Sequence, residues 1–422
     1  MTTRPAGKNA IIFVMITVLL DVITFGLIAP VLPALLVELT GDPVNVVAIY
    51  GGWLMFIYAF NQFLCAPILG GLSDRFGRRP VLLFAIAALG VDYLIMGFAP
   101  TLGWLFVGRF LSGIAGASFT PAYAFVADVS PREKRAQNFG LISASFGIGF
   151  IIGPAIGGLL GTFGPRAPFF VAAAVSLANF AYGTFVLPES LPPERRRAFA
   201  WRRANPLGTL LRMRRHPAVL GLLGALFLWA VAHQVMPATW AFYTKYRFAW
   251  SEATIGASLA LAGAVMALSQ ATLVRVLVPR WGERRTALTG IAVASVGYLG
   301  YGMATQGWMM FAWLGSWLFG AMVMPTTNGY MSHQIEPDAQ GELQGAVASL
   351  YSMSSIVGPP LMSQLFATFS GPHAPLHLPG AAFLAAAVLA ACCFGIYWAA
   401  ARERGPRAVP AATPADGEAA TG

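Results

Sequence analysis

GGLSDRFGRRP, residues 70–80, is a short polar segment between two long apolar runs, 46–70 and 81–99. Its first two glycines permit a sharp turn between two helices. We expect its charged groups to form ion pairs with charges at neighbouring helix ends. These pairs would hold that side of the molecule closed. The residues predicted to form this gate are Gly70, Asp74, Arg75, Gly77, Arg78, Arg79, Asp128 and Arg135, with Asp128 as the partner of Arg78. The alternative is a basic turn with incidental charges.

The two apolar runs belong to a longer series. Of the 422 residues, 57% are hydrophobic and only 10% are charged, whereas soluble domains carry about a quarter charged residues. A helix needs about 20 apolar residues to cross a bilayer, and twelve stretches qualify: 10–36, 46–70, 81–99, 102–127, 138–162, 167–187, 217–243, 253–278, 287–304, 308–331, 342–369 and 378–400. Unbroken runs such as 10–20 contradict the alternating pattern of a β-barrel. The sequence therefore predicts an all-α membrane protein with twelve transmembrane helices.

The first six spans are echoed by the last six. Three motifs recur at an offset of about 205 residues: FGxR at 76–79 and WGxR at 281–284, GAxxxP at 116–121 and 320–325, and GP at 153–154 and 358–359. A duplicated six-helix unit resembles the major facilitator fold, whose two halves rock around a site at the midplane. We expect one half at 1–188, a basic linker at 189–216, a second half at 217–401 and a disordered tail at 402–422. The linker is either a solvated connector or a surface helix on anionic lipid.

The net charge of +10 is explained by orientation and not by nucleic-acid binding. With the N-terminus placed in the cytoplasm, 23 of the 27 Lys and Arg residues fall on the cytoplasmic side, as the positive-inside rule requires. The acidic 336–342 connection is the exception. The sequence thus predicts a multi-pass protein of the bacterial inner membrane with both termini in the cytoplasm, and a first apolar run too long for a cleavable signal.

The chemistry of an enzyme is missing from the sequence. Cys65, Cys392 and Cys393 lie in apolar spans without the spacing of a metal site, so packing is their expected role. We find no nucleophile–base constellation and no phosphate-binding loop, and we expect no cofactor and no metal. The protein is predicted not to be an enzyme.

The span at 138–162 contains a regular series of small residues: Gly149, Gly153, Pro154, Gly157 and Gly158. The glycines at 149, 153 and 157 share one helix face and allow another helix to approach closely, while Pro154 bends the span. This pattern resembles the antiporter motif of drug:proton exporters. Helix packing alone would explain the glycines equally well.

Three ionisable residues lie deep in spans, where each charge costs about 2.5–3.5 kcal/mol. They are Asp21, Asp92 and Arg109, all in the first half. A carboxylate in a low-dielectric cavity favours its protonated form and can carry a proton, whereas arginine cannot release one. We therefore predict proton coupling at Asp21, Asp92 and Arg109, with a structural ion pair between Arg109 and one aspartate as the alternative.

Several neutral polar residues lie in apolar spans. His233 and Gln234 are adjacent in the span at 217–243, and the others are Gln62, Gln270 and Asn328. They could bind the substrate, or each could instead bond neighbouring helices.

At this point the chain resembles the tetracycline-efflux family of twelve-span drug:proton antiporters. The resemblance rests on LLDVITFGLIAPVLP, APILGGLSDRFGRRPVLL, GRFLSGIAGA, FGIGFIIGPAIGGL and LQGAVASLYSMSSIVGPPL, within residues 18–365. It implies roles in transport for Asp21, Gln62, Asp74, Asp92, Arg78 and Arg109. Two departures concern groups linked to the metal–tetracycline complex, since Ser295 and Met266 replace the family's aspartate and histidine.

The sequence thus favours a proton-coupled antiporter that exports a drug-like small molecule other than tetracycline. Its expected partners are that substrate, protons and the lipid bilayer, and we expect a monomer. Proton-coupled uptake of a metabolite, or a sensor on the same fold that does not transport, are the alternatives.

Overall fold

The computed structural model describes residues 8–116, 119–197, 217–336, 339–372 and 374–402. Most of the predicted linker and the predicted tail lie outside these ranges. In the first half the helices are α1 (Lys8–Ile28), α2 (Leu32–Thr40), α3 (Val44–Phe76), α4 (Arg78–Gly97), α5 (Leu102–Ala115), α6 (Phe119–Val129), α7 (Arg135–Gly161) and α8 (Ala167–Val186).

The second half holds α10 (Pro217–His233), α11 (Val235–Phe248), α12 (Glu252–Leu268), α13 (Val274–Met303), α14 (Gly307–Trp313), α15 (Trp317–Gly320), α16 (Val323–Ser332), α17 (Gln340–Ser370) and α18 (Ala381–Arg402). Short 3₁₀ segments lie at Arg132–Lys134, Pro193–Arg195 and Leu314–Ser316, and a π-helix lies at Ser269–Leu273. No strand occurs in the described ranges.

Nine helical stretches of the described residues are long and apolar enough to span a membrane. One of them, Glu252–Met303, is 52 residues long and contains a non-helical residue at Gly282, so it accommodates two spans. α5 with α6, and the 31-residue α17, provide two further membrane-length segments. The all-α membrane fold predicted from the sequence is confirmed. Its first span is shorter than predicted, because the chain leaves α1 after Ile28, next to Pro30, and starts the separate helix α2.

The duplicated turn has the same backbone geometry in both halves. Gly77 has φ 106° and ψ 158°, and Gly282 has φ 76° and ψ 160°. Residues with a side chain rarely adopt this region, so glycine is required at both places. The prediction that Gly70 and Gly71 form the turn is wrong, because α3 continues through them to Phe76.

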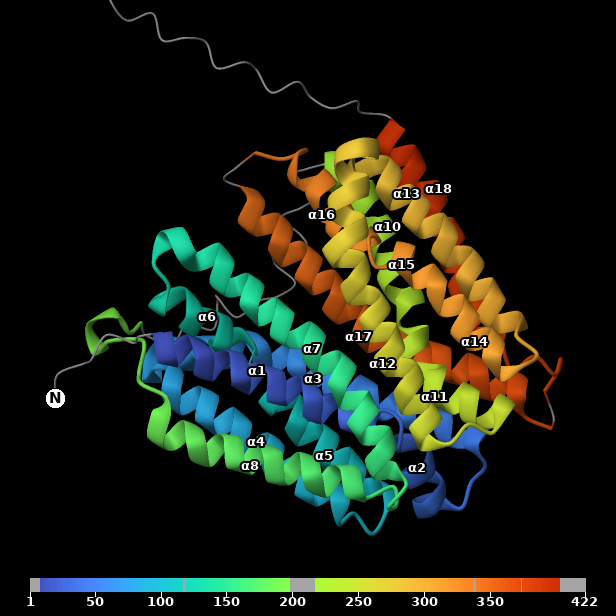
Figure 1. Ribbon diagram of the computed structural model, residues 1–422, viewed down its shortest axis with the longest axis horizontal. Coiled ribbons are helices and arrows are strands. Elements are labelled where there is room, and N and C mark those ends of the chain that lie inside the picture. Colours follow the sequence, from blue (N-terminus) through green and yellow to red (C-terminus); the bar gives the residue numbers. More distant parts are fainter. Residues whose placement is uncertain (1–7, 117–118, 198–216, 337–338, 373, 403–422) are drawn as a thin grey trace, which may run out of the picture.

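The halves meet through α7 against α12, and through α3 against α17 and α11. Each contact depends on small residues: a Cβ at Gly158 would lie 3.0 Å from the Gly256 Cα, and one at Gly52 would lie 2.9 Å from the Pro359 carbonyl oxygen. These approaches lie far along α7 and α3 from the end that carries residues 73–79, which we call the motif end. Toward the motif end a Cβ at Gly140 would meet nothing within 4 Å, and Figure 1 shows the two halves diverging there.

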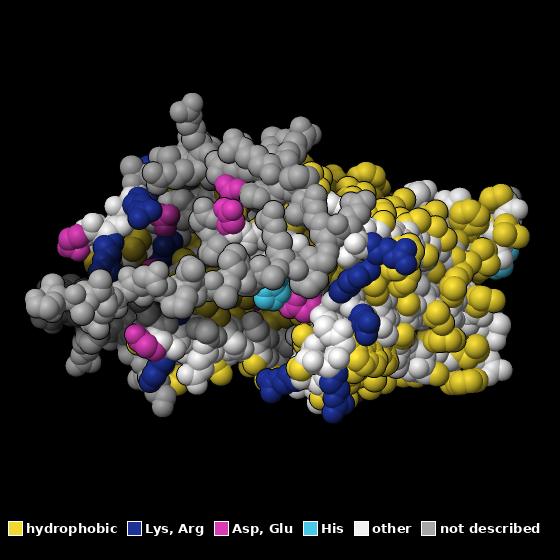
Figure 2. All heavy atoms as spheres, turned by 90° about the horizontal axis from the view of Figure 1, so that it is seen from above, with side chains coloured by type: hydrophobic (Ala, Val, Ile, Leu, Met, Phe, Trp, Pro, Cys, Tyr) yellow, Lys and Arg dark blue, Asp and Glu magenta, His cyan; other side chains and the backbone are white. Residues whose placement is uncertain are grey.

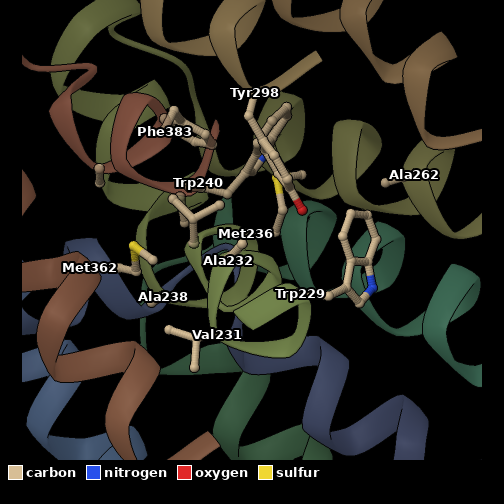
Figure 3. Close-up of a cluster of buried hydrophobic side chains, with 14 of the residues drawn as sticks. Trp229, Val231, Ala232, Met236, Ala238, Trp240, Ala262, Tyr298, Met362 and Phe383 are labelled. Carbon is tan, nitrogen blue, oxygen red and sulfur yellow. The ribbon is translucent and has the colours of Figure 1, made fainter. Parts of the chain in front are cut away.

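The distribution of side chains suits a protein embedded in a bilayer. In Figure 2 the charged side chains lie over the left and the middle of the visible face, while its right-hand end is mainly hydrophobic or neutral. The second half has an aromatic core that includes Trp229, Trp240, Tyr298 and Phe383 (Figure 3).

The contact between α7 and α12 can be tested with a disulfide. In a chain freed of its three cysteines, we expect Gly158→Cys and Ala253→Cys to crosslink under oxidation, since the Cβ of residue 158 would lie 3.1 Å from the Ala253 Cα. A protease site inserted between 198 and 216 then gives two fragments that stay joined until reduction.

The control pairs Ala253→Cys with Gly140→Cys, which lies roughly 27 Å away along the same helix, and should separate after cleavage. Separation of the 158–253 pair under the same oxidation would contradict the packing.

Candidate functional site

A buried ion pair lies inside the first half, between α4 and α5. Asp92 is fully buried, and its Oδ2 lies 3.6 Å from Nη2 of Arg109, which is 9% exposed. Gly108 permits this approach, since a Cβ there would lie 2.5 Å from Asp92 Oδ1. Arg109 directs Nε and Nη2 at the sulfur of Met96, at 3.2 and 2.9 Å. Neither Asp92 oxygen makes a hydrogen bond of normal length and angle to a described residue, although the Ser112 side chain acts on the carboxyl group together with Arg109.

Tyr58 connects this pair to the third ionisable residue. The Arg109 guanidinium lies 5.8 Å from the Tyr58 ring centroid, and the charges of Asp21, Asp92 and Arg109 all act on the Tyr58 hydroxyl. Asp21 is buried on α1 at 9% exposure. Its carbonyl oxygen accepts from the Thr24 hydroxyl. The structure thus brings the three predicted proton-coupling residues into one neighbourhood.

Gln62 completes the group. Its Nε2 donates to the Tyr58 hydroxyl at 3.3 Å and to the Gly116 carbonyl at 2.9 Å. We call Asp21, Tyr58, Gln62, Asp92 and Arg109 the buried polar cluster. Gln62 was predicted to bind substrate, and here it ties α3 to the end of α5.

The predicted gate is organised around Arg78 at the start of α4. Arg78 Nη1 lies 2.6 Å from Asp74 Oδ1, and its Nε lies 3.2 Å from Asp128 Oδ2. The pairing with Asp128 predicted from the sequence is therefore present. Arg135 donates to the Ala127 carbonyl at 3.1 Å, and the Arg75 guanidinium lies 5.1 Å from the Phe76 ring centroid.

Glu189 contacts the predicted gate, and the sequence reasoning missed it. Its Oε1 accepts the backbone N–H of Arg78 at 2.8 Å, and its Oε2 accepts that of Arg79 at 3.3 Å. The carboxylate therefore caps the N-terminus of α4, where free N–H groups favour a negative charge. The Arg79 side chain donates to the Thr184 carbonyl at 2.6 Å, which also ties the turn to the end of α8.

The glycine series on α7 forms two contacts. Cβ atoms at Gly149 and Gly153 would lie 3.0 and 2.7 Å from backbone oxygens of α1, and Gly157 also packs on α1. Gly158 instead faces α12 of the other half, and Pro154 lies inside α7. The series joins α1, α7 and α12 closely.

The remaining predicted binding residues do not converge. Gln234 donates to Ser355 at 2.8 Å, and Asn328 donates to Gln344 at 3.3 Å. Gln270 is exposed within the π-helix. His233 lies in a different setting, beside the Trp317 ring at a centroid distance of 5.0 Å.

Ser295 and Met266, the two positions that depart from the family pattern, contact different groups. The Ser295 hydroxyl donates back to the Ile291 carbonyl of its own helix at 2.8 Å. Met266 lines a pocket together with His233. No group of three or more His, Cys, Asp or Glu side chains that could hold a metal occurs in the described ranges.

The chain is similar to several known proteins in sequence and in fold. The model of the Major Facilitator Superfamily matches residues 14–305 and 235–420. The chain is 40% identical to the class C tetracycline resistance protein of Escherichia coli, over 86% of this chain and 90% of that protein. It is 39% identical to the class G protein of Vibrio anguillarum, over 86% and 92%. A solved bacterial homologue of the human lysosomal transporter Spinster, inward-facing and occupied, superposes with a TM-score of 0.78 at 15% identity, over 95% of this chain and 98% of that one.

The ion pair predicts a strong dependence of stability on both partners. Arg109→Met leaves Asp92 buried and unpaired, which costs about 3–5 kcal/mol when a buried pair is broken. Asp92→Leu with Arg109→Met removes both charges and should recover most of that loss. Thermal unfolding of purified protein in detergent measures both variants. Equal losses in the single and the double variant would contradict the pairing.

The Glu189 cap predicts a smaller effect. Glu189→Ala should lower stability by about 1 kcal/mol, the usual value of an N-cap, because two N–H groups lose their acceptor. Glu189→Gln retains an acceptor oxygen and should lose less. Glu194→Ala, a few residues along the same segment, is the matched control. The cap would be contradicted if Glu194→Ala lowered the unfolding temperature as much as Glu189→Ala does.

Proposed function

The chain belongs to the major facilitator superfamily and, within it, to the family of tetracycline resistance proteins, and from that premise we propose that it exports a drug-like small molecule in exchange for protons. Membership makes it a multi-pass membrane transporter and not an enzyme. Proton exchange and the class of substrate are the proposed parts.

The buried polar cluster is the observation that carries the proposal. It places two carboxylates and one arginine inside the first half, where an unneutralised charge is costly. The second half has no acidic residue between Glu252 and Glu283, or between Glu283 and Glu336. Proton binding is therefore assigned to Asp21 and Asp92, while Arg109 keeps its charge and competes with protons for the carboxylates.

The proposed direction of transport rests on the distribution of charge between the two ends of the helices. The motif end carries Arg75, Arg78 and Arg79, and the positive-inside rule assigns such an end to the cytoplasm. On that assignment both termini are cytoplasmic and the halves diverge toward the inside of the cell, so a compound would enter from the cytoplasm. Closing the gate would then require the motif end of the second half to approach Asp74 and Arg78. The segments 1–188 and 217–401 would be the two moving units.

The substrate is proposed to differ from tetracycline. Ser295 bonds its own helix, and Met266 offers a thioether in place of an imidazole. Neither residue supplies the charge or the ligand that the family resemblance associates with the metal–tetracycline complex. An organic molecule that needs no metal suits these positions better.

Asp21→Asn tests the proton step. Everted membrane vesicles energised by respiration should accumulate substrate with the wild-type protein, because one charge moving across about 100 mV supplies roughly 2.3 kcal/mol. This drives about a fifty-fold gradient. Asp21→Asn should abolish that accumulation, while substrate-for-substrate exchange, which needs no net proton movement, continues.

The matched control is Asp42→Asn, which replaces an aspartate that accepts from Tyr50 outside the cluster. It should transport normally. Near-normal accumulation with Asp21→Asn, or accumulation that survives an uncoupler, would refute proton coupling at this site.

Growth assays test the substrate. In cells lacking their own drug exporters, expression should raise the inhibitory concentration of tetracycline less than twofold. Met266→His combined with Ser295→Asp should raise it further, since the pair restores both family groups. Strong tetracycline resistance from the unaltered chain would overturn the substrate proposal.

A further inference from the structure

The segment that leaves α8 crosses the duplicated turn of the first half. The carboxylate of Glu189 on this segment accepts four backbone N–H groups. Two of them belong to the start of α4, those of Arg78 at 2.8 Å and Arg79 at 3.3 Å. The other two belong to the segment itself, those of Ser190 and Leu191, both at 3.0 Å. One side chain therefore ties the segment to the turn, through hydrogen bonds that its charge strengthens.

The same segment is also fastened to the other side of the turn. After the 3₁₀ turn at Pro193–Arg195, the backbone N–H of Arg197 donates to the Asp74 carbonyl oxygen at 3.0 Å. Between the two attachments Leu191 is buried. Residues 189–197, which we call the strap, thus hold both the end of α3 and the start of α4.

Within the described part of the chain, the strap covers only one of the two duplicated turns. A Cβ at Gly77 would collide with the Glu189 carboxylate and would lie 3.1 Å from Nη2 of Arg196. A Cβ at Gly282, which has the same backbone conformation, would meet no described atom within 4 Å. The strap is therefore an addition to the duplicated plan and is not needed to form the turn. This asymmetry indicates a further role in the first half.

The strap matters because the gate residues lie on the turn that it holds. Arg78 pairs with Asp74 and Asp128, and the Asp74 side chain is still 43% exposed. In the closed state of the gate these groups would have to meet the motif end of the second half. A turn that is already ordered loses less conformational entropy on forming new contacts than a mobile one. An ordered turn therefore makes closure less costly.

We propose that the strap positions the gate through its attachments at Glu189 and at the Arg197 N–H, and so favours closure of the motif end. This inference rests on the proposed alternation of the two halves during export. Glu189 is then a positioning residue that acts through Arg78 and Asp74, and the first residues of the predicted linker belong to the gate. A strap that only stabilised the fold would leave the ratio of open to closed protein unchanged.

Two single-cysteine reporters measure that ratio without substrate or a proton gradient, each in the full-length chain freed of its three cysteines. The inner reporter is Gly140→Cys, at the open motif end, where a Cβ would meet nothing within 4 Å. The outer reporter is Asn45→Cys, a buried position at the opposite end that faces Gly371 of the other half. A membrane-impermeant maleimide labels the inner reporter in inside-out vesicles and the outer reporter in right-side-out vesicles.

Glu189→Ala should speed labelling of the inner reporter and slow that of the outer reporter, because the motif end closes less often. We expect the outer rate to fall about fivefold, the factor that loss of one net hydrogen bond would give. Arg197→Pro, which removes the N–H donated to Asp74, should shift both rates in the same directions. Arg196 already has φ −68° and ψ 141°, a conformation that a following proline permits.

The controls retain the attachments. Arg197→Ala keeps the N–H, and Glu194→Ala lies within the strap but takes part in neither attachment, so both should label like the parent. Glu189→Gln keeps one acceptor oxygen and should shift the rates less than Glu189→Ala. If Glu189→Ala aggregates on gel filtration, the comparison of Arg197→Pro with Arg197→Ala decides the matter.

Three results would overturn the strap's role in the gate. The first is a lower unfolding temperature in Glu189→Ala and Arg197→Pro with both labelling rates unchanged. The second is an equal shift in Arg197→Ala and Arg197→Pro, and the third is an outer reporter that is never labelled in the parent chain. Failure of the export proposal is seen separately, as absent accumulation in energised vesicles while the labelling shifts persist.

Discussion

The arrangement of the first half depends on satisfying charge inside an apolar medium. Asp92 and Arg109 would each be costly alone in a span, and at 3.6 Å they offset each other. The pair requires α4 and α5 to approach closely, which Gly108 permits. In this arrangement no hydrogen bond of normal geometry from a described residue reaches the carboxylate, and Arg109 supplies the charge beside it. Such a pair is stable while closed and is sensitive to a proton, since protonating Asp92 removes the attraction.

The two halves share a backbone plan but differ in chemistry. Gly77 and Gly282 adopt the same unusual conformation at the duplicated turn. The residue that follows is Arg78 in one half and Glu283 in the other. Arg78 pairs with Asp128, whereas Glu283 lies 3.6 Å from His333 at the corresponding place, so the acidic and the basic residue have exchanged positions. Duplication preserved the turn, because glycine alone fits it, and left the charges free to change.

Parts of this organisation follow directly from the sequence. The twelve apolar stretches, the duplicated turn and the pairing of Arg78 with Asp128 were predicted because length, repetition and charge are local signals. The assignment of the turn to Gly70 was wrong, since glycine also serves helix packing. Glu189 was missed because it contacts Arg78 across 111 residues, and no local pattern marks such a contact.

Tyr58 and Met96 were missed for a different reason. In an apolar span each resembles ordinary core packing. Their roles beside Arg109 arise only when α3, α4 and α5 are brought together. Sequence patterns thus identified the charged members of the cluster but not the neutral side chains that surround them.

Close helix packing runs without a break from α12 of the second half to α1 of the first half. Met266 lies one turn along α12 from Gly263, whose Cβ would lie 3.0 Å from Ile151 on α7. On the same helix Gly149 packs against Val22, the neighbour of Asp21 on α1. Because the glycines leave no flexible side chains along this route, a displacement of α12 would be passed to α7 and from α7 to α1. The glycine series on α7 would then couple the movement of the two halves as well as let the helices approach.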